Sequence, residues 1–141
     1  MRAISMLLGA AVALALLMRT RGARGTHRVA KERGTIGSLE GDRQVLAALQ
    51  DAGADLTKVT EVNFYLYFDD RAAADVVAEE VATPPLTATV SRGADDSSWL
   101  CFVTGKMVPS ESAIHAMSAR LVELAHLHNG EYDGWEAAVT E

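Results

Sequence analysis

The sequence predicts an α+β domain in which helices cover one face of a four-stranded antiparallel sheet. Alternating and helical patterns succeed one another after residue 40 in the order α, then β-α-β-β-α-β. The chain has 141 residues, of which 49% are hydrophobic and 23% charged, as is typical of a single folded domain. Its single cysteine, Cys101, excludes an internal disulfide framework and a multi-cysteine zinc site.

An uncharged apolar run, residues 3–18, lies at the start of the chain. As a helix it would span about 24 Å, which is short for a hydrocarbon core of about 30 Å. We therefore expect residues 1–18 to be a membrane anchor or a signal segment. The sequence Ala13-Leu14-Ala15 fits a signal cleavage site but lies inside the run, which favours an uncleaved anchor. A disordered tail and a start codon placed too far upstream are the alternatives.

Charge is divided unevenly along the chain. Residues 1–34 carry seven basic groups and one acid, a net charge of +6, whereas residues 35–141 carry six basic groups and eighteen acids, a net charge of −12. Because six of the basic residues follow the apolar run, the positive-inside rule predicts that the rest of the chain lies on the cytoplasmic face of the inner membrane. Residues 19–40 are expected to form a basic flexible linker before a domain at 41–141.

The first half of that domain is predicted to contain a helix, a strand and a second helix. Asp42 is a predicted N-cap and Gly53 a predicted C′ residue, which places the first helix at 42–52. The strand at 61–68 alternates strictly, with Val62, Phe64, Leu66 and Phe68 on its core face and Asn63, Tyr65 and Tyr67 on the other.

The second helix is predicted to begin after Asp69-Asp70, since acidic residues suit a helix N-terminus. It ends near residue 81 because Pro84-Pro85 cannot continue it. Its expected core residues are Ala73, Val76, Val77 and Val81.

The second half is predicted to contain a hairpin, a long helix and a last strand. Residues 86–91 and 98–107 form the hairpin strands around a turn at 92–97. Ser110 caps a helix that runs to about His128, with an apolar stripe of Ile114, Met117, Leu121, Leu124 and either Leu127 or His128. The last strand, 132–139, is interrupted by Gly134, which permits a bulge or a close backbone approach.

This order of elements is the split βαβ pattern of the ferredoxin-like βαββαβ sandwich, here preceded by one helix. Right-handed crossovers favour the strand order 4-1-3-2. About 105 residues can bury a sufficient core without a metal or a disulfide.

No motif in the sequence predicts catalysis, a cofactor or a metal. His115, His126 and His128 lie on the long helix at spacings that do not bring them to one metal ion, so we interpret them as structural. Cys101 lies in mid-strand without a basic neighbour and is interpreted as a core residue. The adjacent acids cap helices or solvate surfaces, and no glycine-rich phosphate loop is present.

Direct nucleic-acid binding is also disfavoured. Ferredoxin-like sheets often stack RNA bases on aromatic residues, a position that Tyr65 and Tyr67 could take. The net charge of −12 would repel phosphates, and the strand after Trp99 lacks the aromatic signature of an RNA recognition motif. We expect the first helix or a second subunit to cover the tyrosines, and we expect the acidic surface to suit a basic protein partner.

Residues 130–136, with the sequence Gly-Glu-Tyr-Asp-Gly-Trp-Glu, resemble the closing motif of the RraB family, the protein inhibitors of ribonuclease E. Residues 52–56, residues 61–68 and the Met-Val-Pro sequence at 107–109 also fit this family. The likeness covers about residues 41–139, the whole predicted domain. It implies the same ferredoxin-like fold that the residue pattern predicts.

The resemblance implies a non-catalytic domain that binds an endoribonuclease and modulates RNA cleavage without a cofactor. The residues that we predict to contact a partner are Tyr65, Tyr67, Asp69, Asp70 and Trp135. Structural packing is the alternative role for Tyr132 and Trp135. Two other functions stay open: a secreted or periplasmic binding domain, and a small-molecule-sensing ferredoxin-like domain that dimerises through a sheet edge.

Overall fold

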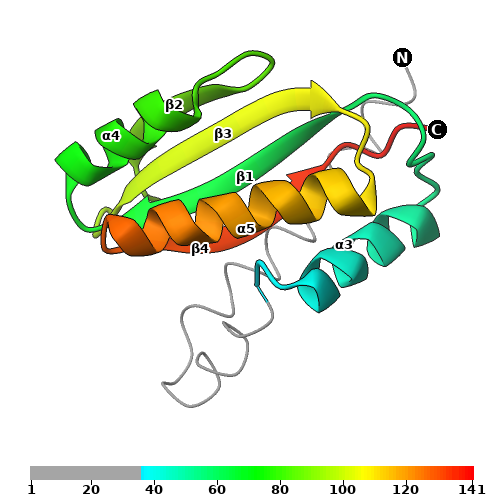
Figure 1. The fold of residues 1–141 in the computed structure, drawn as a ribbon, viewed down its shortest axis with the longest axis horizontal. Helices are drawn as coiled ribbons and strands as arrows, with labels where there is room; N and C mark the ends of the chain where they lie inside the picture. The colour runs from blue at the N-terminus through cyan, green and yellow to red at the C-terminus, as the bar shows by residue number, and fades with distance from the viewer. Residues whose placement is uncertain (1–35) are drawn as a thin grey trace.

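The computed structural model describes residues 36–141, which form one antiparallel sheet and three helices (Figure 1). The elements are α3 (Leu39–Asp51), β1 (Thr60–Phe68), α4 (Arg71–Val81), β2 (Thr87–Arg92), β3 (Trp99–Met107), α5 (Glu111–Leu127) and β4 (Gly130–Ala137). The sheet order is β2-β3-β1-β4, which confirms the predicted order 4-1-3-2. The predicted N-terminal anchor and nearly all of the linker, residues 1–35, lie outside the described residues.

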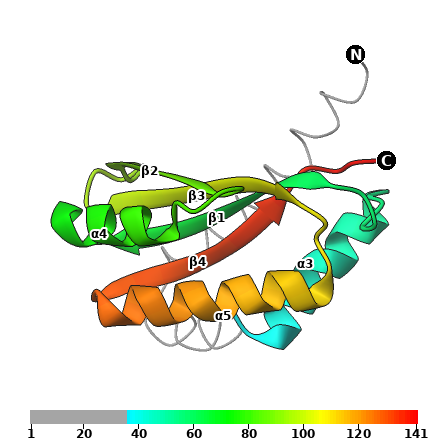
Figure 2. The same ribbon diagram turned by 45° about the horizontal axis from the view of Figure 1, so that its top comes forward.

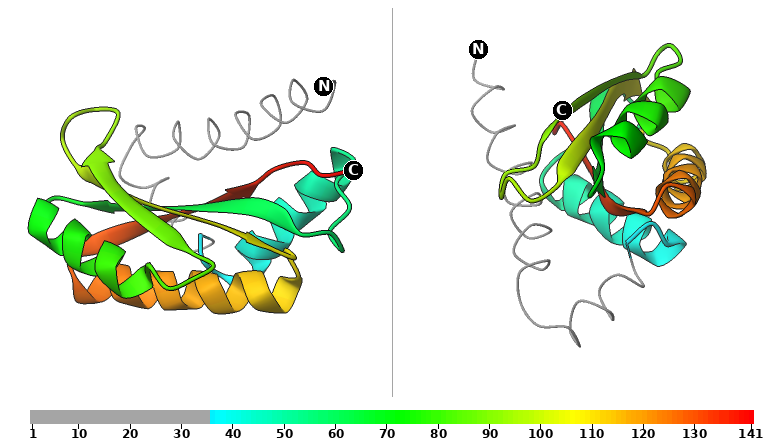
Figure 3. Two further views of the ribbon diagram at one scale, coloured as in Figure 1. Left: turned by 90° about the horizontal axis from the view of Figure 1, so that it is seen from above. Right: turned by 90° about the vertical axis from the view of Figure 1, so that its left-hand side faces the viewer.

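The helices lie on one side of the sheet (Figures 2 and 3). α4 packs against β2 and β3, α5 packs against β4 and β1, and α3 extends the helix layer by packing beside α5. Strict alternation in β1 turns Val62, Phe64 and Leu66 toward the helices, where each is fully buried. The other face of β1 carries the half-buried Tyr65 and Tyr67, as predicted.

Side-chain caps begin each of the three described helices. Asp70 caps α4 by accepting a hydrogen bond from the Ala72 amide, and Ser110 caps α5, as the sequence predicts. The predicted N-cap role of Asp42 is wrong. α3 begins one turn earlier, because Ser38 Oγ accepts a hydrogen bond of 3.0 Å from the Gly41 amide and supplies the cap instead.

The buried stripe of α4 is rotated from the predicted one. Ala74, Val77, Ala78 and Val81 face the sheet, whereas the predicted core residue Val76 is 49% exposed. The two alanines let the helix approach β2 and β3 closely, and this spacing still follows the i, i+3, i+4, i+7 rule. In α5 the predicted stripe residues Ile114, Leu121 and Leu124 are buried and Met117 is half-buried. Of the two alternatives for its last position, His128 is half-buried, whereas Leu127 is 69% exposed.

A bulge in β4 sets the direction of its two large aromatic side chains. The register with β1 shifts between Tyr65 and Leu66, so that Leu66 pairs with Tyr132 and Phe64 pairs with Trp135. Tyr132 and Trp135 are three residues apart and would face opposite sides of a regular strand. The extra residue at the bulge turns both toward the helix layer, and Gly134 supplies the required positive φ of 101°.

Replacing Gly134 with alanine should therefore lower the free energy of unfolding. A Cβ at a positive φ costs about 1 to 2 kcal/mol, and relief of that strain by regularising the strand would turn Tyr132 or Trp135 out of the core. Gly53→Ala is the matched control, because Gly53 also has a positive φ, 94°, but its added Cβ meets nothing within 4 Å. Urea denaturation should show a larger loss for Gly134→Ala, and equal losses would contradict a special role for the bulge.

Candidate functional site

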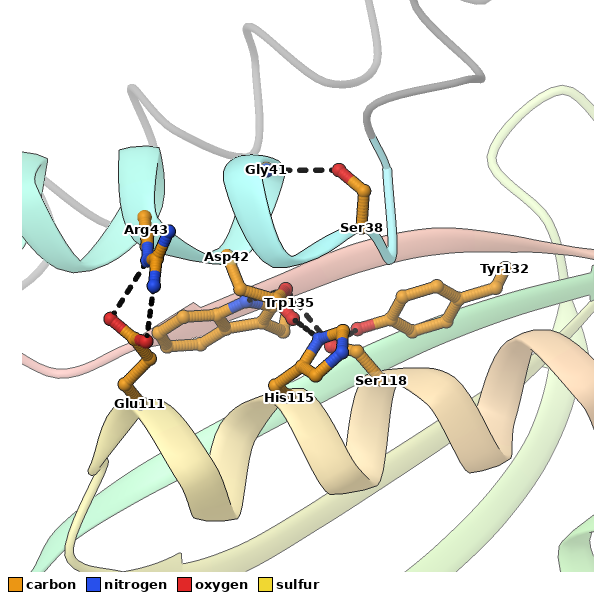
Figure 4. Close-up of polar contacts among 9 residues, drawn as sticks. All are labelled: Ser38, Gly41, Asp42, Arg43, Glu111, His115, Ser118, Tyr132 and Trp135. Atoms are coloured by element: carbon orange, nitrogen blue, oxygen red, sulfur yellow. Dashed lines mark hydrogen bonds and ion pairs between the residues drawn. The ribbon is translucent and has the colours of Figure 1, made fainter.

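The most densely connected polar group of the described residues is the carboxylate of Asp42, which is 1% exposed (Figure 4). Its Oδ1 accepts hydrogen bonds from Ser118 Oγ at 3.0 Å and from the Trp135 indole Nε1 at 3.1 Å. Its Oδ2 lies 3.1 Å from His115 Nδ1. One side chain of α3 is thereby joined to two of α5 and one of β4, and the buried carboxylate keeps hydrogen-bond partners on both oxygens.

Tyr132 extends this network inside the core. Its hydroxyl lies 3.1 Å from Ser118 Oγ. Burial raises the pKa of the Tyr132 phenol far above its ordinary value, so the group stays neutral and can donate or accept. Among residues 36–141, no buried side-chain polar atom lacks a hydrogen-bond partner. The network is complete as a structural unit.

A surface ion pair also joins α3 to α5, outside the buried network. The Arg43 guanidinium binds both carboxylate oxygens of Glu111 at 3.0 and 2.9 Å, and so links α3 to the first turn of α5. The hydrogen bond from Arg43 lowers the pKa of the Glu111 carboxyl. Both side chains are about half exposed, so this pair contributes less than the buried network.

The network does not have the geometry of a catalytic centre. Ser118 is fully buried and donates to Asp42, whereas nucleophilic catalysis requires an accessible hydroxyl activated by a base. Cys101 is also fully buried, and burial raises the pKa of its thiol to about 11. No group of three potential metal-ligating side chains is found among residues 36–141, and no helix in that part of the chain is long and apolar enough to cross a membrane.

The sheet face opposite the three described helices, here called the open face, brings together other residues predicted from the sequence. The Tyr65 ring meets Phe102 edge to face at a centroid distance of 5.4 Å, and the Tyr65 hydroxyl donates to Glu136. Tyr67 lies two residues further along the same face of β1, paired in register with Leu100. All three described helices lie on the other side, so the predicted cover of the tyrosines by the first helix is wrong (Figure 3).

Four of the five predicted partner residues lie along β1 and its end. Asp69 and Asp70 directly follow the tyrosine strand and are exposed, and Asp70 also caps α4. Trp135 is separated from them, because it faces the helix layer and is 1% exposed. The predicted contact of Trp135 with a partner is inconsistent with this burial, and packing with an indole hydrogen bond to Asp42 takes its place.

The role of Asp42 was missed at the level of sequence, although a signal for it exists. Asp42, Val45, Leu46 and Leu49 follow one helical stripe, and all four are buried. Extending the stripe by one turn from Val45 would have placed Asp42 in the core and the cap further upstream. His115 and Ser118 are three residues apart on α5, which puts them on the same side of that helix.

Comparison with known families gives one match over this fold. Residues 39–137 match the family model described as regulator of ribonuclease activity B. The chain belongs to the RraB family. A search of curated proteins found no match. The matched range begins at the first residue of α3 and ends at the last residue of β4, so the RraB domain includes the Asp42 network and the whole sheet.

Replacing Asp42 with alanine should destabilise the domain by about 3 to 5 kcal/mol, because it leaves buried donors without their acceptor. Asp42→Asn should cost less, about 1 to 2 kcal/mol, since its amide oxygen can still accept from Ser118 and Trp135. Glu40→Ala, which removes an exposed acid from the same helical turn, serves as the control. Chemical denaturation followed by tryptophan fluorescence measures these losses, and similar values for Asp42→Ala and Glu40→Ala would contradict the central role of the network.

The Cys101 thiol should resist alkylation in the native protein at pH 8. With a pKa of about 11, only about one thiol in a thousand is ionised at that pH, and the side chain is fully buried. An unfolded cysteine has a pKa of about 8.5, so denaturant should make labelling fast. Because the pKa of the Cys101 thiol is higher in the folded protein than in the unfolded chain, the free energy of unfolding should also decline as pH rises from about 9 to 11, where only the unfolded thiol ionises. Rapid, complete labelling without denaturant would contradict the structure.

Proposed function

We propose that this RraB-family protein regulates an endoribonuclease of the ribonuclease E type by binding it directly, without catalysing a reaction itself. The observation that carries this proposal is the family match over residues 39–137, which includes every strand and helix described. Within the core, the nucleophilic side chains Ser118 and Cys101 are inaccessible, so we assign them to packing and not to catalysis.

The open face of the sheet is the proposed contact surface. It combines a half-buried aromatic patch, formed by Tyr65, Tyr67 and Phe102, with acids on the neighbouring strand positions. Glu131 pairs in register with Tyr67, and Glu136 pairs with Asn63. Aromatic faces and carboxylates together suit arginine, whose planar guanidinium stacks on a ring and forms hydrogen bonds with an acid.

Charge supports a basic protein segment as the partner. Residues 36–141 carry eighteen acids and six basic residues, so their net charge is −12. A field of this sign attracts a lysine- or arginine-rich segment and repels the phosphates of RNA. The protein would then bind the enzyme and not the RNA.

We further propose that the domain works on the cytoplasmic face of the inner membrane, with residues 3–18 as its anchor. Fractionation of cells into membrane and soluble extracts tests this placement.

Tyr67→Ala should weaken binding of the full chain to a purified ribonuclease E-type enzyme by about tenfold or more, because it removes an aromatic contact from the proposed surface. Val76→Ala is the matched control, since Val76 is an apolar side chain, 49% exposed, on α4 and therefore on the opposite side of the protein. Titration by calorimetry at low and at high salt measures both effects, and binding of the wild type should weaken with salt.

Two results would contradict the proposal. The first is that the wild-type chain fails to bind the enzyme at low salt. The second is that Val76→Ala weakens binding as much as Tyr67→Ala does. In a parallel titration with RNA alone, Tyr67→Ala should behave as the wild type does, because the acidic domain lacks the positive surface that phosphates require and the basic excess lies in residues 1–34.

A further inference from the structure

The two edges of the sheet differ in how they are protected. β4 forms one edge. A bulge next to Gly134 interrupts its pairing with β1, and the strand carries three acidic residues, Glu131, Asp133 and Glu136. Bulges and charges are the features by which proteins keep edge strands from pairing with other chains. Within residues 36–141, β4 is therefore a protected edge.

The other edge, β2, has no bulge and no acid, and its one charged residue, Arg92, lies at its end. Its sequence Thr-Ala-Thr-Val-Ser-Arg is rich in β-branched residues, pairs with β3 without a register shift, and has exposed residues at Thr87, Thr89 and Ser91. Pro84-Pro85 lies before the strand and leaves its amides intact. No acid occurs from residue 82 to residue 94, although the domain is strongly acidic elsewhere.

We propose that β2 pairs antiparallel with β2 of a second copy, which joins two four-stranded sheets into one of eight strands. A two-fold axis perpendicular to the sheet keeps the helices of both copies on one side. Each residue then lies opposite a residue whose side chain points to the same side of the sheet. Centred on Thr89, the pairing places Thr89 opposite its own counterpart and Thr87 opposite Ser91. Threonine and serine pairs of this kind stabilise antiparallel strands.

Charge favours a second copy of this chain at that edge. Arg92 is the one charged residue of β2, and its guanidinium lies 4.7 Å from the centroid of the Trp99 ring on the helix side. In the paired arrangement Arg92 reaches Leu86 of the other copy, close to the end of that copy's α4. The adjacent acids Glu79 and Glu80 are exposed in the last turn of α4, and the helix dipole is negative there. The two arginines lie at opposite ends of the interface and do not repel each other.

Cysteine cross-linking of the full chain tests the pairing and its register. In Thr89→Cys the two cysteines face each other across the axis within disulfide reach, so a mild oxidant should give mostly covalent dimer. Thr87→Cys alone and Ser91→Cys alone should not cross-link, because each lies roughly 13 Å from its own counterpart. A mixture of those two variants, one carrying a mass tag, should give the mixed dimer. The native Cys101 is buried and adds little background.

A charge substitution gives an independent readout of the same axis. Thr89→Lys brings two ammonium groups face to face and should weaken the dimer at least tenfold in analytical ultracentrifugation. Thr87→Lys is the control, since it puts the same charge on the same exposed strand but opposite Ser91, and it should leave the dimer largely intact. Circular dichroism checks that both variants fold.

Three outcomes would overturn the inference: absence of cross-linking at Thr89→Cys, equal cross-linking at all three cysteine positions, or a wild-type chain that sediments as a monomer at about 100 µM. None of these measurements involves a ribonuclease. Thr89 borders the aromatic patch, since it pairs in register with Phe102, but it is not one of the residues proposed to contact the enzyme. Failure of the dimer would leave the proposed function standing, and failure of enzyme binding would leave the dimer standing.

Discussion

The architecture depends on one buried negative charge. Transfer of the Asp42 carboxylate out of water costs several kcal/mol, and the fold offsets this only where side chains of α5 and β4 meet it together. The network therefore fixes α3 against the rest of the domain at a set position and rotation. Without it, α3 would contact the domain mainly through an apolar stripe and the exposed Arg43–Glu111 pair, which restrict its position less.

The position of α3 also depends on the bulge in β4. Trp135 and Tyr132 reach the network, directly and through Ser118, only because the extra residue turns both toward the helices. Their spacing of three residues is incompatible with one face of a regular strand, so the glycine, the bulge and the buried carboxylate require one another. A local irregularity at a sheet edge thereby determines how a helix far away in the sequence packs.

Most of the fold can be predicted from local sequence patterns. The predictions that were wrong for Asp42 and Trp135 concern side chains whose surroundings come from distant parts of the sequence or from an irregular strand. The alternation in 61–68, Asp70 as a cap and the Pro84-Pro85 break all act locally, and each was predicted correctly. Asp42 was read as a cap because aspartate is common there, while its true environment is built by residues 73 to 93 positions away. Trp135 was predicted to contact a partner, with packing as the alternative, because alternation cannot show its burial where a bulge reverses the pattern. On the open face, β1 alternation alone placed Tyr65 and Tyr67 together.

The Tyr-Asp-Gly-Trp core of the family motif and the proposed contact surface use different side chains. The two lie close together, because Glu131 and Glu136 of the surface flank that core and the tyrosines lie in 61–68, which also fits the family. The Tyr-Asp-Gly-Trp sequence contains the bulge and supplies hydrogen-bond donors to the buried network. The motif by which the chain resembles the RraB family therefore has a structural role in the core. The aromatic patch and the β2 edge lie outside that motif, and their side chains can change without disturbing Asp42. Family membership therefore explains why this sequence has this fold, while the proposed binding of a ribonuclease and the proposed pairing of two copies involve surface side chains outside the buried network.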